Sequence, residues 1–122
     1  NIINHLNSNI FIGLNFLSYL NLSFNFIDSI SNNLFRELSI LKVLDLRNNM
    51  IKLIEENSFQ NLHSLKFFYL SFNPIKYLIN SNKTLIGLSK LKYFYVPNDV
   101  YLSENTNMIL KRIFNPEIIK TV

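Results

Sequence analysis

The chain has 122 residues, of which 48% are hydrophobic, and its 12 basic and 8 acidic side chains give a formal net charge of +4. It contains no cysteine, so disulfides, cysteine-ligated metals and thiol catalysis are excluded from these residues. No apolar run approaches the ~18 residues of a membrane-spanning helix, and the scattered basic residues are less dense than a usual nucleic-acid footprint, so we expect no nucleic acid partner.

An asparagine or aspartate recurs at nearly equal intervals along the chain. The positions are Asn1, Asn25, Asn49, Asn73 and Asp99, and the intervals are 24, 24, 24 and 26 residues. A period in this range predicts a solenoid, in which each unit buries its apolar face only against its neighbours. Because the first residues already stand inside this frame, we expect the natural chain to carry further repeats upstream.

Apolar residues occupy fixed places around these positions. Three near-complete units follow one another: Leu17-x-x-Leu20-x-Leu22-x-x-Asn25-x-Ile27-x-x-Ile30, Leu41-x-x-Leu44-x-Leu46-x-x-Asn49-x-Ile51-x-x-Ile54 and Leu65-x-x-Phe68-x-Leu70-x-x-Asn73-x-Ile75-x-x-Leu78. A partial unit precedes them (Asn1, Ile3, Leu6), and a weaker one follows (Leu91-x-x-Phe94-x-Val96-x-x-Asp99-x-Tyr101). Each unit also carries a second apolar pair: Phe11/Leu14, Phe35/Leu38, Phe59/Leu62 and Leu85/Leu88.

The apolar-x-apolar step, as in Leu20-x-Leu22, has period 2 and predicts a short strand with one buried face. Stacked units align such strands into a parallel sheet about 4.8 Å apart. The Phe-x-x-Leu step has helical spacing and turns the chain back. An asparagine side chain both donates and accepts, so the recurring asparagines predict a hydrogen-bonded ladder between units. Asp99 cannot donate when ionised and marks the end of that ladder.

The pattern changes after Asp99. Ser103 is a suitable N-cap for a helix through about Phe114, and Asn115-Pro116 stops it. We expect this helix to cover the apolar end of the solenoid; a helix lying on a membrane surface is the alternative.

The frame resembles the leucine-rich repeat family, whose pattern is L-x-x-L-x-L-x-x-N-x-L, over residues 1 to about 101. The 24-residue length resembles the typical subclass, which is common in receptor ectodomains and in secreted matrix or adhesion proteins. The resemblance implies an α/β solenoid, a right-handed curved stack with a short parallel sheet on its concave face. We expect residues 1–101 to form the repeats and residues 102–122 a C-terminal helical cap.

In this family the outward positions of the strands form the concave face. Here they place Phe67, Tyr69, Tyr93 and Tyr95 in one aromatic cluster, with Tyr19 set apart and Asp45 and Arg47 beside it. Aromatic and arginine side chains are the usual interface anchors, so we expect these residues to bind a partner. The alternative is that aromatic residues simply suit strands.

Other residues give weaker signals. Lys42, Lys66 and Lys92 align between units, as do Lys52 and Lys76, and predict two basic ladders that are either solvated or attract an acidic partner or anionic lipid. Phe24 and Phe72 are expected to pack at the strand edge. Two glycosylation sequons begin at Asn21 and Asn82, in a number that chance explains; Asn82 is the better acceptor. No motif for a metal, cofactor, small-molecule substrate or catalytic activity is found, and His5, His63 and the Glu55-Glu56 pair are expected to be solvated.

The sequence therefore predicts a non-catalytic module that binds a protein or peptide through its strand face, within a larger receptor or adhesion-type protein. The alternative is a structural spacer whose ligand site lies elsewhere. The family resemblance favours an extracellular or membrane-anchored ectodomain.

Overall fold

The computed structural model describes residues 1–76, 83–97 and 119–121 of the chain. Three expected features lie outside these residues: Asp99, the sequon at Asn82 and the helix from Ser103 to about Phe114. The described part of the chain contains no helix. It accordingly holds none that is long and apolar enough to cross a membrane.

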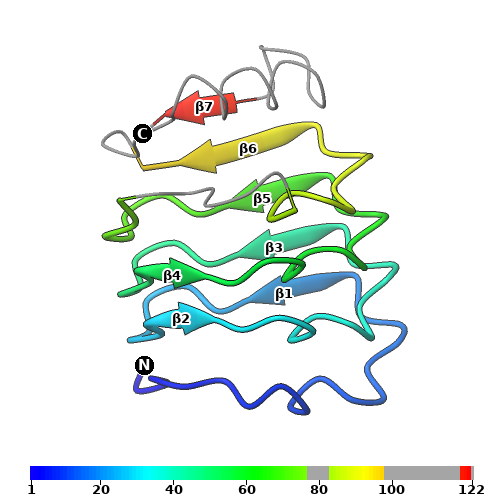
Figure 1. Ribbon diagram of the computed structural model, residues 1–122, viewed down its shortest axis with the longest axis horizontal. Helices are drawn as coiled ribbons and strands as arrows, with labels where there is room; N and C mark the ends of the chain where they lie inside the picture. The colour runs from blue at the N-terminus through cyan, green and yellow to red at the C-terminus, as the bar shows by residue number, and fades with distance from the viewer. Residues whose placement is uncertain (77–82, 98–118, 122) are drawn as a thin grey trace.

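A parallel sheet runs through the stack (Figure 1). Its strands are β1 (Tyr19–Asn21), β3 (Val43–Asp45), β5 (Phe67–Tyr69), β6 (Tyr93–Val96) and β7 (Ile119–Thr121), in that order. Each residue pairs with its equivalent in the next repeat, as Leu20 does with Leu44 and Leu44 with Phe68. The repeat frame therefore becomes the register of the sheet, and the chain is a solenoid.

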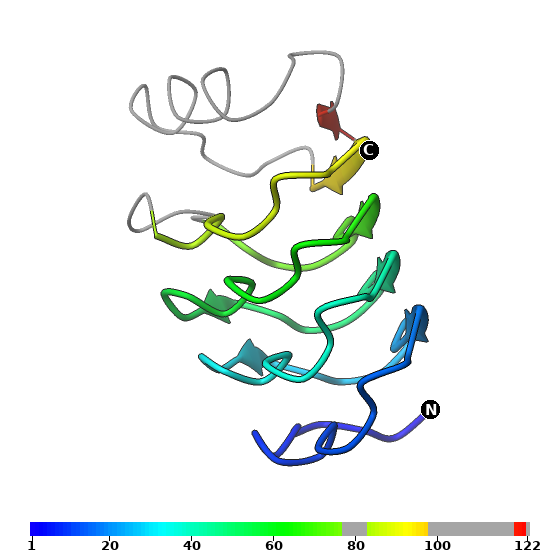
Figure 2. The same ribbon diagram turned by 90° about the vertical axis from the view of Figure 1, so that its right-hand side faces the viewer.

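The sequence did not predict two of the observed features. Strands β2 (Ser29–Ile30) and β4 (Leu53–Ile54) form a second parallel sheet, which Figure 2 shows across the stack from β1 and β3. Strand β7 lies within residues 102–122, the range expected to form a helical cap, and it extends the parallel sheet beyond β6.

The Phe-x-x-Leu segments turn the chain back without forming a helix. In each of them the leucine N–H donates to the carbonyl three residues earlier, at distances of 3.2 Å for Phe11–Leu14 and 3.0 Å for both Phe35–Leu38 and Phe59–Leu62. A single turn of this kind has helical spacing without helical length. The expected α component of the fold is thus absent from the described residues.

Phenylalanines form a continuous column through the core. The rings of Phe11, Phe35 and Phe59 stack at centroid distances of 5.8 and 6.1 Å. Phe59 then meets Phe68 edge-on at 5.0 Å, and Phe68 stacks on Phe94 at 4.9 Å. Such pairs add about 0.5–1.5 kcal/mol each beyond the burial of apolar area. The core therefore ties each repeat to the next and holds the strands in register.

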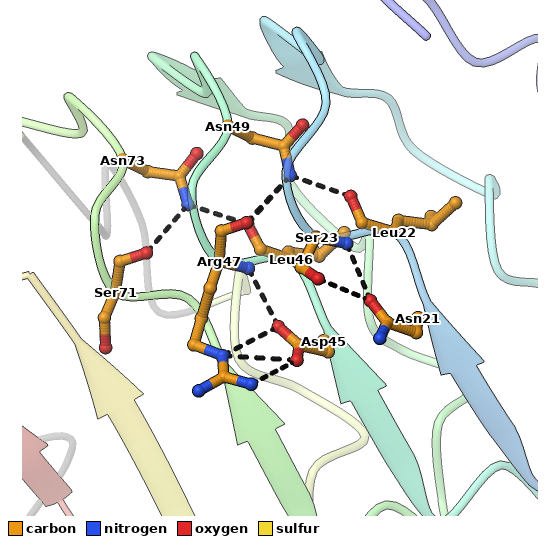
Figure 3. A network of polar contacts seen from close by, with 9 residues as sticks. All are labelled: Asn21, Leu22, Ser23, Asp45, Leu46, Arg47, Asn49, Ser71 and Asn73. Atoms are coloured by element: carbon orange, nitrogen blue, oxygen red, sulfur yellow. Dashed lines mark hydrogen bonds and ion pairs between the residues drawn. The ribbon is translucent and has the colours of Figure 1, made fainter. Parts of the chain in front are cut away.

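The recurring asparagines bridge consecutive units. Asn49 Oδ1 accepts a hydrogen bond from the Ile27 N–H at 3.1 Å. Its Nδ2 donates to the carbonyls of Leu22 at 2.9 Å and Leu46 at 3.1 Å (Figure 3). Asn73 repeats this arrangement one unit later: it accepts from the Ile51 N–H at 3.1 Å. Each side chain satisfies backbone groups of its own loop and of the preceding unit, so the ladder fixes the spacing between units.

Candidate functional site

The parallel sheet buries alternate residues and leaves the others facing outward. Leu44, Phe68 and Phe94 point into the core and are fully buried. Their strand neighbours form two rows on the outward face, because a strand alternates its side chains between faces. The register defines the Tyr93 row as Tyr19, Val43, Phe67 and Tyr93, and the Tyr95 row as Asn21, Asp45, Tyr69, Tyr95 and Lys120.

Four rings of these rows form one contiguous aromatic cluster, Phe67, Tyr69, Tyr93 and Tyr95. Phe67 stacks on Tyr93 at 5.5 Å and Tyr69 on Tyr95 at 5.0 Å, and Tyr93 contacts Tyr95 at 6.5 Å across the rows. Because each ring covers one face of its neighbour, the cluster presents ring edges and phenol hydroxyls to solvent. Within the described residues none of these hydroxyls has a hydrogen-bond partner, so they remain available to a ligand.

An ion pair borders the cluster. Arg47 donates from Nε to Asp45 Oδ1 at 3.0 Å and from its terminal nitrogen to Asp45 Oδ2 at 2.6 Å, and Asp45 is almost fully buried (Figure 3). The Arg47 backbone N–H also donates to Asp45 Oδ1 at 3.0 Å. These contacts hold the guanidinium over the Tyr69 ring, 4.8 Å from its centroid, in cation–π geometry.

Electrostatics couple the ion pair to the rings. The hydrogen bonding of its guanidinium to the Asp45 carboxylate is the main cause that raises the pKa of Arg47 above its usual value. Burial is the main cause that raises the pKa of Tyr69, and the neighbouring Tyr95 adds to it. Tyr19 contributes to both shifts, so its phenol lies within electrostatic range of this group although no ring contact joins it to the cluster.

The expected contact residues therefore fall into two groups. Phe67, Tyr69, Tyr93 and Tyr95 are brought into contact, and Asp45 and Arg47 join them through the Tyr69 ring. Tyr19 is 54% exposed and stands beyond Val43 in its row. Lys120 was missed by the sequence analysis; it is exposed on β7 and pairs in register with Tyr95. It lies in the range expected to be helical, so no repeat signal could have indicated it.

Two aromatic residues differ from their expected role as packing residues. Phe24 and Phe72 are 65% and 57% exposed, and both have a left-handed backbone, with φ of 55° and 58°. Asn48 holds the equivalent place in the unit between them with φ of 53°. Asparagine adopts this conformation with less strain than phenylalanine, so Asn48 was the sequence signal that this position lies in a left-handed turn.

The remaining candidates show no arrangement for chemistry. His5 and His63 are exposed, and Glu55 accepts a hydrogen bond from the Asn32 N–H at 2.8 Å. Asn21 is exposed on β1, and its Oδ1 accepts hydrogen bonds from the N–H and hydroxyl of Ser23. In the described ranges, no group of three or more histidine, aspartate or glutamate side chains could hold a metal ion.

Comparisons with known proteins agree with this geometry. Residues 16–75 match the family described as leucine rich repeat. No curated protein sequence matches the chain. Among solved structures, the crystal structure of the TLR13–ssRNA13 complex is similar, with a TM-score of 0.75 and 28% sequence identity over 83% of this chain. This chain covers 14% of that chain's length.

The prediction of no nucleic acid partner is contradicted by this comparison, because a protein of similar structure forms a complex with a single-stranded RNA. The physical reason is that the prediction judged basic residues by their density along the sequence. A solenoid places residues that are 24 positions apart on adjacent rungs, so lysines that are scattered in sequence are neighbours in space. The backbone N–H of Lys66, for example, donates to the carbonyl of Lys42 at 2.9 Å.

Proposed function

The chain belongs to the leucine-rich repeat family, and we propose that it is a ligand-binding module that binds single-stranded RNA through the outward face of its parallel sheet. One observation carries the proposal: Phe67, Tyr69, Tyr93 and Tyr95 form a contiguous cluster on that face, with Tyr93 exposed and the other three half-buried. Their tyrosine hydroxyls have no partner in the described residues. Exposed aromatic groups at this density typically mark a contact site.

The chemistry of the cluster suits unpaired bases. Proteins that bind single strands combine aromatic rings, on which bases stack, with nearby positive charge. Phe67 stacks on Tyr93 on one side and lies in register with Val43 on the other. Tyr93 is 42% exposed, so it is the ring of the cluster most accessible to a base. The phenols of Tyr93 and Tyr95 can donate to base or sugar oxygens. The likeness to a protein in complex with single-stranded RNA supports this ligand over others.

The test is titration of a short, fluorescently labelled single-stranded RNA with the 122-residue chain, followed by anisotropy at about 0.1 M salt. Phe67→Ala and Tyr93→Ala are each expected to weaken binding about 5- to 150-fold, the equivalent of about 1–3 kcal/mol per stacked base. Phe26→Ala is the matched control, because it removes an exposed ring outside the cluster. The proposal fails if neither cluster variant loses affinity, or if double-stranded RNA binds as tightly as single-stranded RNA.

A protein or peptide is the second candidate ligand for the same face. It is favoured by the bidentate Asp45–Arg47 pair, which neutralises the charge in the middle of the site. Tyrosine and arginine are also the residues most often found at energetic centres of protein interfaces. A displayed peptide library can be selected for binding to the wild-type chain, and peptides that also bind the Tyr69→Ala variant can be discarded. Peptides that bind this face would then be enriched. A surface scan without any sensitive strand position would instead favour a structural spacer within a larger receptor or adhesion-type protein.

A further inference from the structure

Three lysines stand on consecutive rungs at the N-terminal ends of the strands. One lysine directly precedes each of three strands: Lys42 precedes β3, Lys66 precedes β5 and Lys92 precedes β6. Their backbones are joined by hydrogen bonds, from the Lys66 N–H to the Lys42 carbonyl at 2.9 Å and from the Lys92 N–H to the Lys66 carbonyl at 2.8 Å. We call this set the lysine ladder. In the first repeat Ser18 takes the same place, and its backbone carbonyl accepts a hydrogen bond from the Lys42 N–H.

The lysine ladder has no compensating negative charge in the described residues. The ion pairs there join Arg36 to Glu37, Arg47 to Asp45 and Lys83 to Glu56, and none includes a ladder lysine. Neighbouring strands are about 4.8 Å apart, and like charges side by side on adjacent strands destabilise a sheet. Three such charges in a row favour an anionic ligand whose charges also repeat along a line.

The lysine ladder adjoins the aromatic cluster. Lys66 is followed by Phe67, and Lys92 by Tyr93, so each positive charge is one residue from a ring of the Tyr93 row. Each lysine precedes its strand and carries a flexible four-carbon stem, so its charge can reach the outward face. A ligand lying along the stack can then meet a line of positive charge and a line of rings together. Single-stranded nucleic acid has this composition, because its charged backbone and its planar bases run in parallel.

We propose that Lys42, Lys66 and Lys92 bind the phosphate backbone of a single-stranded RNA that runs along the stack, with its bases over the Tyr93 row. The inference rests on the proposed function. It adds the path of the RNA along the stack and the residues that contact its phosphates. Each lysine that contacts a phosphate releases condensed counterions on binding, so the contacts are measurable from the salt dependence of affinity.

The experiment measures the slope of log affinity against log salt concentration for the labelled RNA. For a single strand, each phosphate contact contributes about 0.7 to the magnitude of the slope. Lys42→Gln, Lys66→Gln and Lys92→Gln are therefore each expected to reduce it by about 0.7, and the triple variant by about 2. Lys52→Gln and Lys76→Gln are matched controls, since they remove exposed charges beyond the asparagine ladder and should leave the slope unchanged.

The outcomes separate the inference from the proposed function. If RNA binds but the ladder variants and the controls change the slope equally, the lysine ladder is not a phosphate site. If RNA does not bind at all, the proposed function itself fails. Polyglutamate is the probe for an acidic protein. If the lysine ladder variants weaken polyglutamate binding but not RNA binding, and Phe67→Ala leaves polyglutamate binding unchanged, the site takes an acidic protein instead. The triple variant should unfold at or above the wild-type temperature, because it removes repulsion, so lost binding would not reflect misfolding.

Discussion

The asparagine ladder gives the sharpest test of the fold, through Asn49→Ala. The substitution removes one acceptor and the donors on Nδ2. The carbonyls of Leu22 and Leu46 lose one partner each but keep another, because Asn25 also donates to Leu22 and Asn73 to Leu46. The Ile27 N–H, in contrast, donates only to Asn49 and belongs to a fully buried residue. The variant therefore leaves one buried donor without a partner.

That single orphaned group sets the magnitude. A buried donor left unsatisfied costs about 1–3 kcal/mol, and we expect the free energy of unfolding of Asn49→Ala to fall by this amount. Asn73→Ala should cost at least as much, because the Ile51 N–H that it orphans is equally buried and the Leu70 carbonyl also loses its donor within the described residues. Asn25→Ala should cost less, because the Ile3 N–H belongs to a residue that is 39% exposed and can turn to water.

Urea denaturation of the three variants, followed by circular dichroism, measures these differences. The order of the three losses matters more than their absolute size, because it cancels effects common to removing an asparagine from this turn. A loss for Asn25→Ala equal to or greater than that for Asn49→Ala would refute the reasoning. It would show that burial of the orphaned N–H does not control the cost.

Three further predictions concern stability. Phe72→Asn should raise the free energy of unfolding by about 0.5–1 kcal/mol, since asparagine tolerates the left-handed backbone that phenylalanine strains, as Asn48 does in the preceding unit; thermal denaturation checks it, and a lower midpoint would contradict it. Gly87→Ala should cost more than the ~1–2 kcal/mol of a positive φ alone, because its Cβ would overlap the Gln60 carbonyl oxygen; wild-type stability would show that this turn shifts freely. Stability should fall as pH rises above about 10, because the raised pKa of Tyr69 means that the unfolded chain loses this proton first; Tyr69→Phe should weaken that dependence in urea titrations, and an unchanged profile would count against it.

The strands and their register could be predicted from the sequence because they follow from the period. Leu20, Leu44 and Phe68 pair directly, as equal spacing in a stack requires. The two-residue strands β2 and β4 could not be predicted, since two residues carry no alternation that distinguishes a strand from a turn.

The aromatic cluster could also be located from the sequence, but its environment could not. Alternation alone put Tyr69 and Tyr95 on one face. The near-complete burial of Asp45 and the guanidinium over the Tyr69 ring depend on side-chain conformations that a repeat pattern does not encode. The exposure of Phe72 was missed for a related reason. Its backbone dihedral decides the direction of the ring, and the sequence shows only that an aromatic residue stands beside a ladder asparagine.

Two sets of residues on the outward face should contribute differently to RNA binding and to its salt dependence. At its centre, Asp45 neutralises Arg47, so the rings act there with little net charge. At its edge, Lys66 and its neighbours on adjacent rungs have no negative partner within the described residues. Losing a ring should then weaken RNA binding equally at low and high salt, whereas losing a ladder lysine should weaken it mainly at low salt. A protein ligand that is held by the same rings and carries no excess negative charge would lack the second effect, so the pair of measurements separates such a ligand from RNA.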